Sequence, residues 1–125
     1  MKIRVYYEDT DAGGIVYHTN YIKYCERARS EIFFEQDLMP TLGENEGFVV
    51  RNIDASFMAT STLGDMLDIK TKLLSLKNSS AVLCQEVWRD DDKLFYMEVV
   101  LVYIKQGKPC RIPSKLREVF TEDYY

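Results

Sequence analysis

Histidine, cysteine and proline are scarce in this 125-residue chain, which has one histidine, three cysteines and three prolines. A site built on several imidazoles is therefore excluded within one chain. Cys25, Cys84 and Cys110 are odd in number and widely spaced, which excludes a disulfide scaffold and a Cys-x-x-Cys zinc site. We expect all three to be small, reduced hydrophobic residues of a protein in a reducing compartment.

Long apolar runs and an excess of positive charge are also missing. The longest apolar run, residues 99–104, falls far short of the ~20 residues that cross a bilayer. The start of the chain becomes charged before the apolar region of a signal peptide could form. Sixteen basic residues against twenty acidic ones leave a net charge of −4, which argues against a nucleic-acid partner. We expect a cytoplasmic protein with no stable membrane insertion.

Hydrophobic residues are abundant and follow two different periods. At 46% hydrophobic and 13% aromatic, the chain can form one domain over residues 1–125. Apolar residues at helical spacing predict one long helix over residues 20–36. Extended patterns predict strands over residues 2–8, 49–58, 67–73, 82–89 and 94–104, turns at 90–93 and 105–109, and a short helix at 113–120.

The order of these elements predicts an α+β fold. Four consecutive strands with short connections require an antiparallel sheet, and the long helix covers one of its faces. The strand over residues 94–104 is apolar on both faces, which places it near the middle of the sheet. Because the other sheet face is left for a partner, we expect a homo-oligomer.

The main candidate site is residues 7–18, Tyr-Glu-Asp-Thr-Asp-Ala-Gly-Gly-Ile-Val-Tyr-His. Crowded carboxylates raise one another's pKa, which favours proton acceptance, and paired glycines let the backbone approach a ligand. The N-terminus of the following helix can hold a polarised carbonyl oxygen. Together these features favour attack on an activated carbonyl. The alternative is a polar loop followed by an ordinary helix cap.

Several single residues have both a functional and a structural interpretation. His18 can bind substrate, orient water or transfer a proton, or can be a surface residue. Tyr7 is a candidate site residue or a strand aromatic, and Glu26 is a second acid or a solvated helix residue. The spacing of Asp9, Asp11 and Gly13 lacks the further acids of a calcium loop, and residues 90–92 are predicted to form a solvated turn. No metal site is expected.

Residues 6–31 closely resemble the YbgC-like acyl-CoA thioesterases. The resemblance covers residues 7–18 and continues through Asn-Tyr at residues 20–21 and Glu-Arg-Ala-Arg-Ser-Glu at residues 26–31. These enzymes are relatives of 4-hydroxybenzoyl-CoA thioesterase in the hotdog-fold superfamily. Phe-Val-Val-Arg at residues 48–51 and the segment 64–69 extend the match over nearly the whole chain. The resemblance implies a hotdog fold, one long helix packed against a five-stranded antiparallel sheet. It also implies a dimer with a continuous sheet, often doubled to a homotetramer.

The resemblance further implies hydrolysis of acyl-CoA to a free acid and CoA, without metal or cofactor. Asp11 matches the family's catalytic aspartate, as general base or nucleophile, and His18 and Tyr7 match its histidine and tyrosine. The backbone N–H of His18 would polarise the thioester carbonyl. A thiolate, with a thiol pKa of about 8.5, leaves without a strong general acid, so one base and one polarising group can suffice.

Contacts with the substrate are expected from Gly14, Val16, Tyr17, Thr60 and Ser61. Thr60 stands where the family usually has the proline of Ala-Pro-Ala, which leaves the acyl preference open. Five basic residues between 105 and 117 either attract the CoA nucleotide or form a solvated tail.

The sequence is also compatible with two alternative functions. The first is a thioesterase whose substrate is an acyl group on acyl carrier protein. The second is a non-catalytic hotdog module that binds acyl-CoA without turnover, although an intact Asp11 argues against it.

Overall fold

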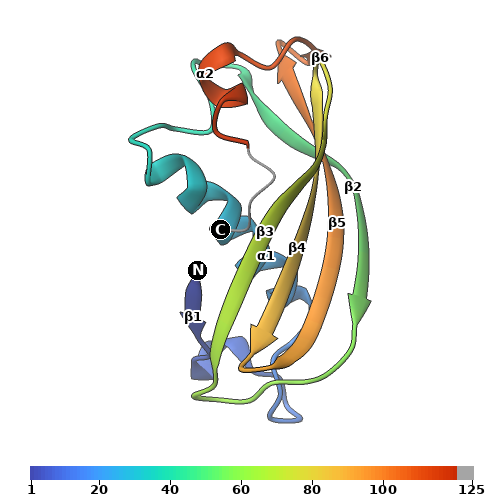
Figure 1. The fold of residues 1–125 in the computed structure, drawn as a ribbon. Helices are drawn as coiled ribbons and strands as arrows, with labels where there is room; N and C mark the ends of the chain where they lie inside the picture. The colour runs from blue at the N-terminus through green and yellow to red at the C-terminus, as the bar shows by residue number, and fades with distance from the viewer. Residues whose placement is uncertain (121–125) are drawn as a thin grey trace.

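The computed structural model describes residues 1–120 (Figure 1). The last five residues of the domain expected over residues 1–125 therefore lie outside the described part. The elements in chain order are β1 (Lys2–Arg4), the 3-10 helix η1 (Tyr7–Asp9), α1 (His18–Phe34), β2 (Glu46–Phe57), β3 (Met66–Leu76), β4 (Ser80–Arg89), β5 (Asp92–Lys105), β6 (Lys108–Pro109) and α2 (Ser114–Arg117).

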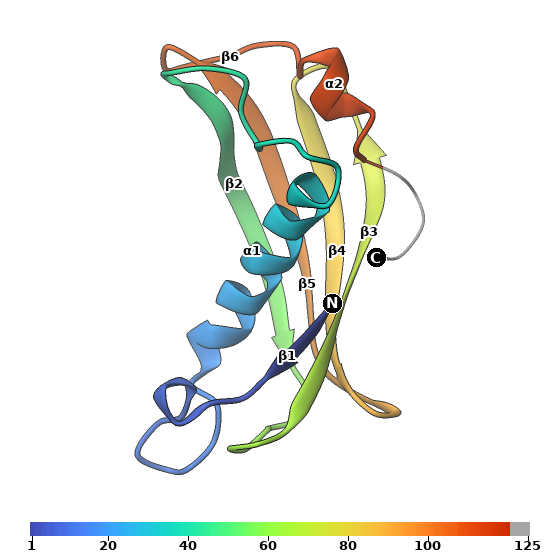
Figure 2. The same cartoon turned by 90° about the vertical axis from the view of Figure 1, so that its left-hand side faces the viewer.

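All strands belong to one antiparallel sheet in the order β1-β3-β4-β5-β2, with β6 paired to β5. Helix α1 lies across one face of this curled sheet (Figure 2). The α+β class and the single long helix are thus confirmed. So is the place of β5 inside the sheet, between β4 and β2.

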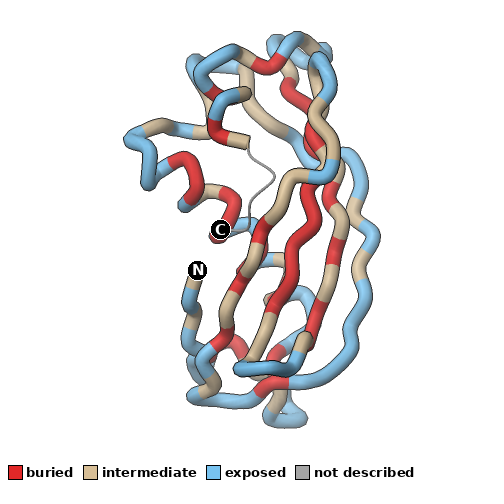
Figure 3. The backbone as a smooth tube through the Cα atoms, in the orientation of Figure 1, coloured by how far each residue is buried: buried red, intermediate tan, exposed pale blue. Residues whose placement is uncertain are grey.

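Helix α1 forms because its apolar residues recur every three or four positions and can be buried together on the sheet. The buried face contains the predicted residues Tyr21, Tyr24, Cys25, Ala28 and Ile32. They pack against fully buried side chains of β3, β4 and β5, among them Leu67, Ile69, Val87, Phe95 and Met97. The buried stretches of these strands are red in Figure 3. Each such side chain contributes about 1.5–3 kcal/mol relative to its exposed form, so the helix depends on the sheet for its stability.

Three boundary predictions are wrong in detail. The strand expected over residues 2–8 ends at Arg4, because the next residues turn into η1, where the Asp9 carboxylate accepts the Tyr6 N–H at 2.9 Å. The turn expected at residues 105–109 contains β6, which pairs back on β5. The helix α1 begins at His18, two residues before the predicted start, which makes His18 the first helical residue.

Strand β2 is a long free edge of the sheet. Among residues 1–120 it pairs only with β5, so its outer backbone groups have no strand partner. Val49, Val50 and Phe57 are between 41% and 51% exposed along this strand. Long exposed edges of this kind are usually paired or covered in native proteins.

Candidate active site

The loop between η1 and α1 holds the Asp11 carboxylate at the surface. The Gly13 N–H donates to Asp11 Oδ1 at 2.8 Å, and the Gly14 N–H donates to the Asp11 carbonyl at 3.0 Å. Gly14 has a φ of +81°, a conformation that favours glycine and closes this turn. Asp11 is exposed, and its Oδ2 accepts no hydrogen bond from the described residues. One carboxylate oxygen is therefore fixed and the other is available for chemistry.

The three neighbouring carboxylates do not share one environment, in contrast to the crowding that the sequence predicts. Asp9 is buried, whereas Glu8 and Asp11 are exposed. The Asp9 carbonyl accepts the Tyr17 N–H at 3.0 Å and the Asn20 side-chain amide at 2.8 Å. Asp9 thus joins the loop to the first turn of α1.

The start of α1 presents free backbone donors beside this loop. Tyr17 precedes the helix and provides no side-chain cap, and the N–H groups of His18 and Thr19 find no acceptor among residues 1–120. The first N–H groups of a helix have no partner within it and carry partial positive charge. A carbonyl oxygen placed here can accept such a hydrogen bond.

Among residues 1–120, neither the His18 side chain nor the Tyr7 side chain forms a hydrogen bond with Asp11. The exposed His18 ring packs on Tyr17, with centroids 4.5 Å apart, and edge-on to Phe57 at 6.0 Å. Tyr7 lies on η1 rather than on the predicted strand, and it is 82% exposed. The Tyr7 carbonyl accepts the Thr10 hydroxyl at 2.7 Å. The structure therefore brings Asp11 and the N-terminus of α1 into one loop-and-helix unit and leaves the Tyr7 ring open to solvent.

The residues expected to contact substrate form two groups. Val16 and Ser61 are buried, and the Val16 N–H donates to the Ser61 carbonyl at 2.9 Å. The Ser61 hydroxyl shares a 2.7 Å hydrogen bond with that of Tyr21, so its side chain supports the site from inside. Gly14, Tyr17 and Thr60 are exposed and can meet a ligand directly.

An ion pair that the sequence analysis missed organises the loop around Thr60. Arg89 at the end of β4 donates to Asp65 Oδ2 at 3.0 Å and to the Thr60 carbonyl at 3.2 Å. The Thr62 N–H donates to the same Asp65 oxygen at 2.9 Å. The Thr62 N–H and, after it, Arg89 hold the pKa of Asp65 below its usual value. No local sequence signal joins these residues, because the strand pairing brings Arg89 to the loop.

This arrangement gives an expected pH dependence for Asp65→Asn. Because the pKa of Asp65 is lower in the folded state, the carboxylate stabilises the fold at pH values above its unfolded-state pKa, which is about 3.9 for Asp. This stabilisation is lost as the pH falls through the folded-state pKa. The wild type should therefore exceed the variant in free energy of unfolding at pH 7, and the gap should shrink at pH 3. Urea denaturation at both pH values measures it. Asp91→Asn, in the exposed hairpin turn, is the control, and an equal gap for Asp65→Asn at both pH values would contradict the assignment.

The basic segment over residues 105–117, which includes β6 and α2, lies at the opposite end of the sheet from the loop that precedes α1 (Figure 1). Strand β5, which runs between the two ends of the sheet, has 14 residues and is at most about 46 Å long. Arg111 donates to the Asn78 side chain and Arg117 to the Lys77 carbonyl, each at 2.8 Å, and Lys105 lies 3.9 Å from Glu46. These three side chains thus have structural partners, and the segment cannot meet the Asp11 site of its own chain.

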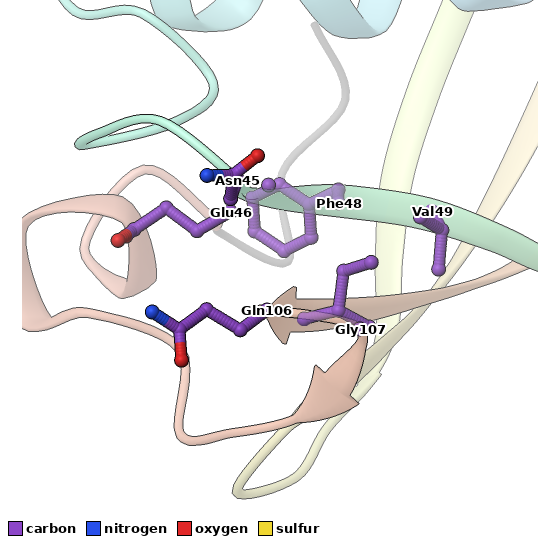
Figure 4. Close-up of a pocket in the computed structure, with 8 residues that line it drawn as sticks. Asn45, Glu46, Phe48, Val49, Gln106 and Gly107 are labelled. Carbon is purple, nitrogen blue, oxygen red and sulfur yellow. The ribbon is translucent and has the colours of Figure 1, made fainter.

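A cavity of about 630 Å³ also lies at that far end. Figure 4 shows the residues that line it at the ends of β2 and β5, among them Asn45, Glu46, Phe48, Val49, Gln106 and Gly107. It opens on the free edge β2 rather than on the loop of Asp11.

Among residues 1–120, no group of three or more His, Cys, Asp or Glu side chains could hold a metal ion. No helix in this part of the chain is both long enough and apolar enough to cross a membrane.

Comparison with known proteins identifies relatives over nearly the full length. Residues 13–96 match the model of the Thioesterase superfamily. The chain is 40% identical to the acyl-CoA thioesterase YbgC of Helicobacter pylori, over 97% of this chain and 98% of the relative. It is 42% identical to the acyl-CoA thioester hydrolase YbgC of Escherichia coli, over 96% of this chain and 93% of the relative.

Solved structures share the same architecture. The gentisyl-coenzyme A thioesterase BH1999 superposes with a TM-score of 0.84 at 28% identity, over 95% of this chain and 97% of that one. A protein from Aquifex aeolicus superposes with a TM-score of 0.90 at 24% identity, over 97% and 98% of the two chains. The second likeness concerns the fold alone.

Proposed function

The chain belongs to the thioesterase superfamily, among the YbgC-like acyl-CoA thioesterases, and we propose that its reaction takes place between Asp11 and the start of α1. The protein is a thioester hydrolase with the hotdog fold, and its substrate is acyl-CoA. The observation that supports this location is an exposed carboxylate, free at Oδ2, beside the uncapped N-terminus of the long helix. The proposed domain spans residues 1–125.

The reaction needs one group that activates the attack and one that stabilises negative charge on the carbonyl oxygen. As general base, Asp11 takes a proton from water while the water oxygen bonds to the carbonyl carbon. As nucleophile, Asp11 attacks that carbon itself, and water then hydrolyses the resulting anhydride. In either case the His18 N–H donates to the developing oxyanion, the C–S bond breaks, and CoA leaves as a thiolate. No metal or cofactor takes part in these steps.

The remaining site residues position the substrate. Gly14, Tyr17 and Thr60 are exposed, as are Tyr7 and His18, so a bound thioester can contact these residues from the solvent side. Val16 and Ser61 act from the core, because their contacts hold the two loops together.

A homo-oligomer, a dimer or a dimer of dimers, is part of this proposal, with the cytoplasm as its compartment. The exposed edge β2 and its apolar residues support pairing with β2 of a second copy. Antiparallel pairing of the two edges would bring the partner's basic segment toward the Asp11 end of this chain. That segment, too distant within one chain, could then attract the CoA phosphates.

Thiol release from butyryl-, dodecanoyl- and benzoyl-CoA tests the proposed activity. We expect turnover of at least one of these esters, with no loss of rate when excess free acyl carrier protein is added. Inhibition by the carrier would instead favour a carrier-bound substrate. Tight binding of all three esters without hydrolysis would overturn the proposal in favour of a binding module.

A further inference from the structure

A polar network is buried between the middle of α1 and the sheet. Arg29, only 9% exposed, donates from Nη1 to Gln85 Oε1 at 2.8 Å. The fully buried Gln85 donates in turn to the Cys25 carbonyl at 2.8 Å and to the Thr71 hydroxyl at 2.9 Å. Both ends of the Gln85 amide are therefore used, and this amide fixes the guanidinium of Arg29.

Among residues 1–120, the hydrogen-bond partner of Arg29 is an amide and not a carboxylate. A guanidinium has five N–H donors, and the one described hydrogen bond goes to the neutral Gln85. Glu26, three residues earlier on the helix, is exposed, and its charge acts on Arg29 without a direct ion pair between the two side chains. Burial lowers the pKa of Arg29 from its usual value. Because burying an unpaired charge is costly, the arrangement favours a functional role for this cation.

Arg29 lines a groove of about 270 Å³ between α1 and strands β2 and β5. Two of the other lining residues, Glu26 and Ser30, are polar, and the rest are apolar, namely Phe33, Pro40, Phe48, Val50 and Leu101. Such a groove suits a hydrocarbon chain that carries a hydrogen-bond acceptor at the end distant from the thioester.

The groove lies on the same face of α1 as the proposed reaction centre. His18, Ile22, Glu26, Arg29 and Phe33 follow one another at spacings of three and four, so they share one side of the helix. Phe57 of β2 packs on His18, and Phe48 of β2 packs on Phe33 at 5.9 Å, so β2 accompanies this face at both ends.

The distance between the two sites suits a long acyl group. Arg29 lies eleven residues after His18, about 16 Å along the helix axis. A chain whose carbonyl oxygen meets the His18 N–H can thus run along this face toward the guanidinium.

We propose that Arg29 binds the distal carboxylate of a dicarboxylic acyl group whose thioester is hydrolysed at Asp11. This inference rests on the proposed function. The planar guanidinium can donate two parallel hydrogen bonds to a carboxylate, which a methyl-ended chain cannot accept. Arg29 is therefore a specificity-determining residue for the acyl end.

The test compares dodecanedioyl-CoA with dodecanoyl-CoA, which have equal chain lengths and differ at the distal end. Wild type should favour the diacid ester, and Arg29→Gln should lower the ratio of the two kcat/KM values by about tenfold or more. Arg29→Lys should restore part of the ratio, because it keeps the charge without the paired donors. Arg27→Gln, which removes an exposed cation from the same helix, is the matched control.

Both substrates are measured on one preparation, so partial unfolding lowers both rates and leaves their ratio intact. A ratio of the two kcat/KM values that is unchanged in Arg29→Gln would overturn the inference. If sedimentation also showed weakened dimers in this variant, Arg29 would instead bind a carboxylate of the partner subunit. Calorimetry with non-hydrolysable thioether analogues of the two esters measures the ratio of their dissociation constants, which tests the same preference without turnover. Failure of the proposed function, with no hydrolysis of either ester, is thereby distinguished from failure of the role of Arg29.

Discussion

Replacing Asp11 by asparagine is expected to lower kcat/KM for acyl-CoA hydrolysis by about 10²-fold or more, the range of a lost general base. The amide oxygen can still accept the Gly13 N–H, so the loop keeps its 2.8 Å hydrogen bond and its shape. The side chain loses its negative charge and with it the ability to take a proton or to attack. Thiol release from the best substrate, corrected for the three cysteines of the chain, measures the effect.

Glu8→Gln is the matched control for Asp11→Asn. Glu8 belongs to the same acidic stretch and is exposed, but it lies on η1, outside the turn that carries the Asp11 carboxylate. Its substitution should leave kcat/KM within about twofold of wild type, well inside the 10²-fold scale of a lost base. Equal rates for wild type and Asp11→Asn would remove Asp11 from the mechanism.

The largest expected effect on stability follows from Phe95→Ala, which should lower the free energy of unfolding by about 3–5 kcal/mol. Phe95 of β5 is fully buried, stacks on Tyr21 at 5.4 Å and lies 5.1 Å from Phe57. Removal of the ring leaves a cavity where α1, β2 and β5 meet. Because Phe57 packs on His18, the variant should also lose activity.

Urea denaturation of Phe95→Ala measures this loss directly. Phe34→Ala is the control, because Phe34 is 44% exposed at the end of α1 and its truncation should cost about 1 kcal/mol or less. A loss for Phe95→Ala no larger than that for Phe34→Ala would contradict the packing of α1 on β5.

The fold was largely accessible from the hydrophobic pattern. Apolar residues follow an alternating pattern within β2 to β5 and recur at helical spacing from Tyr21 to Ile32. Both patterns follow from burial, so the sequence alone predicts these elements. The start of α1 was not accessible in the same way. Asn20 has the side chain of a helix cap, but the Tyr17 N–H binds the Asp9 carbonyl and starts the helix earlier.

For the candidate site, the sequence predicts which stretch carries it but not how its side chains are arranged. The motif and its resemblance predict that Asp11 and His18 act together, but they do not indicate that Asp9 is buried whereas both of these residues are exposed. The pairs Arg89–Asp65 and Arg29–Gln85 join residues 24 and 56 positions apart. Such contacts depend on strand pairing and on the docking of α1, for which no local pattern exists.

The central claim is that the thioester carbonyl lies at the first N–H of α1, beside Asp11. A crystal structure of Asp11→Asn with bound dodecanoyl-CoA tests it most directly, because hydrolysis is slowed while the loop is kept. We expect the carbonyl oxygen about 2.7–3.1 Å from the His18 backbone nitrogen, with the carbonyl carbon facing Asn at position 11. A thioester bound elsewhere, with no hydrogen bond from the first turn of α1, would contradict the proposed mechanism.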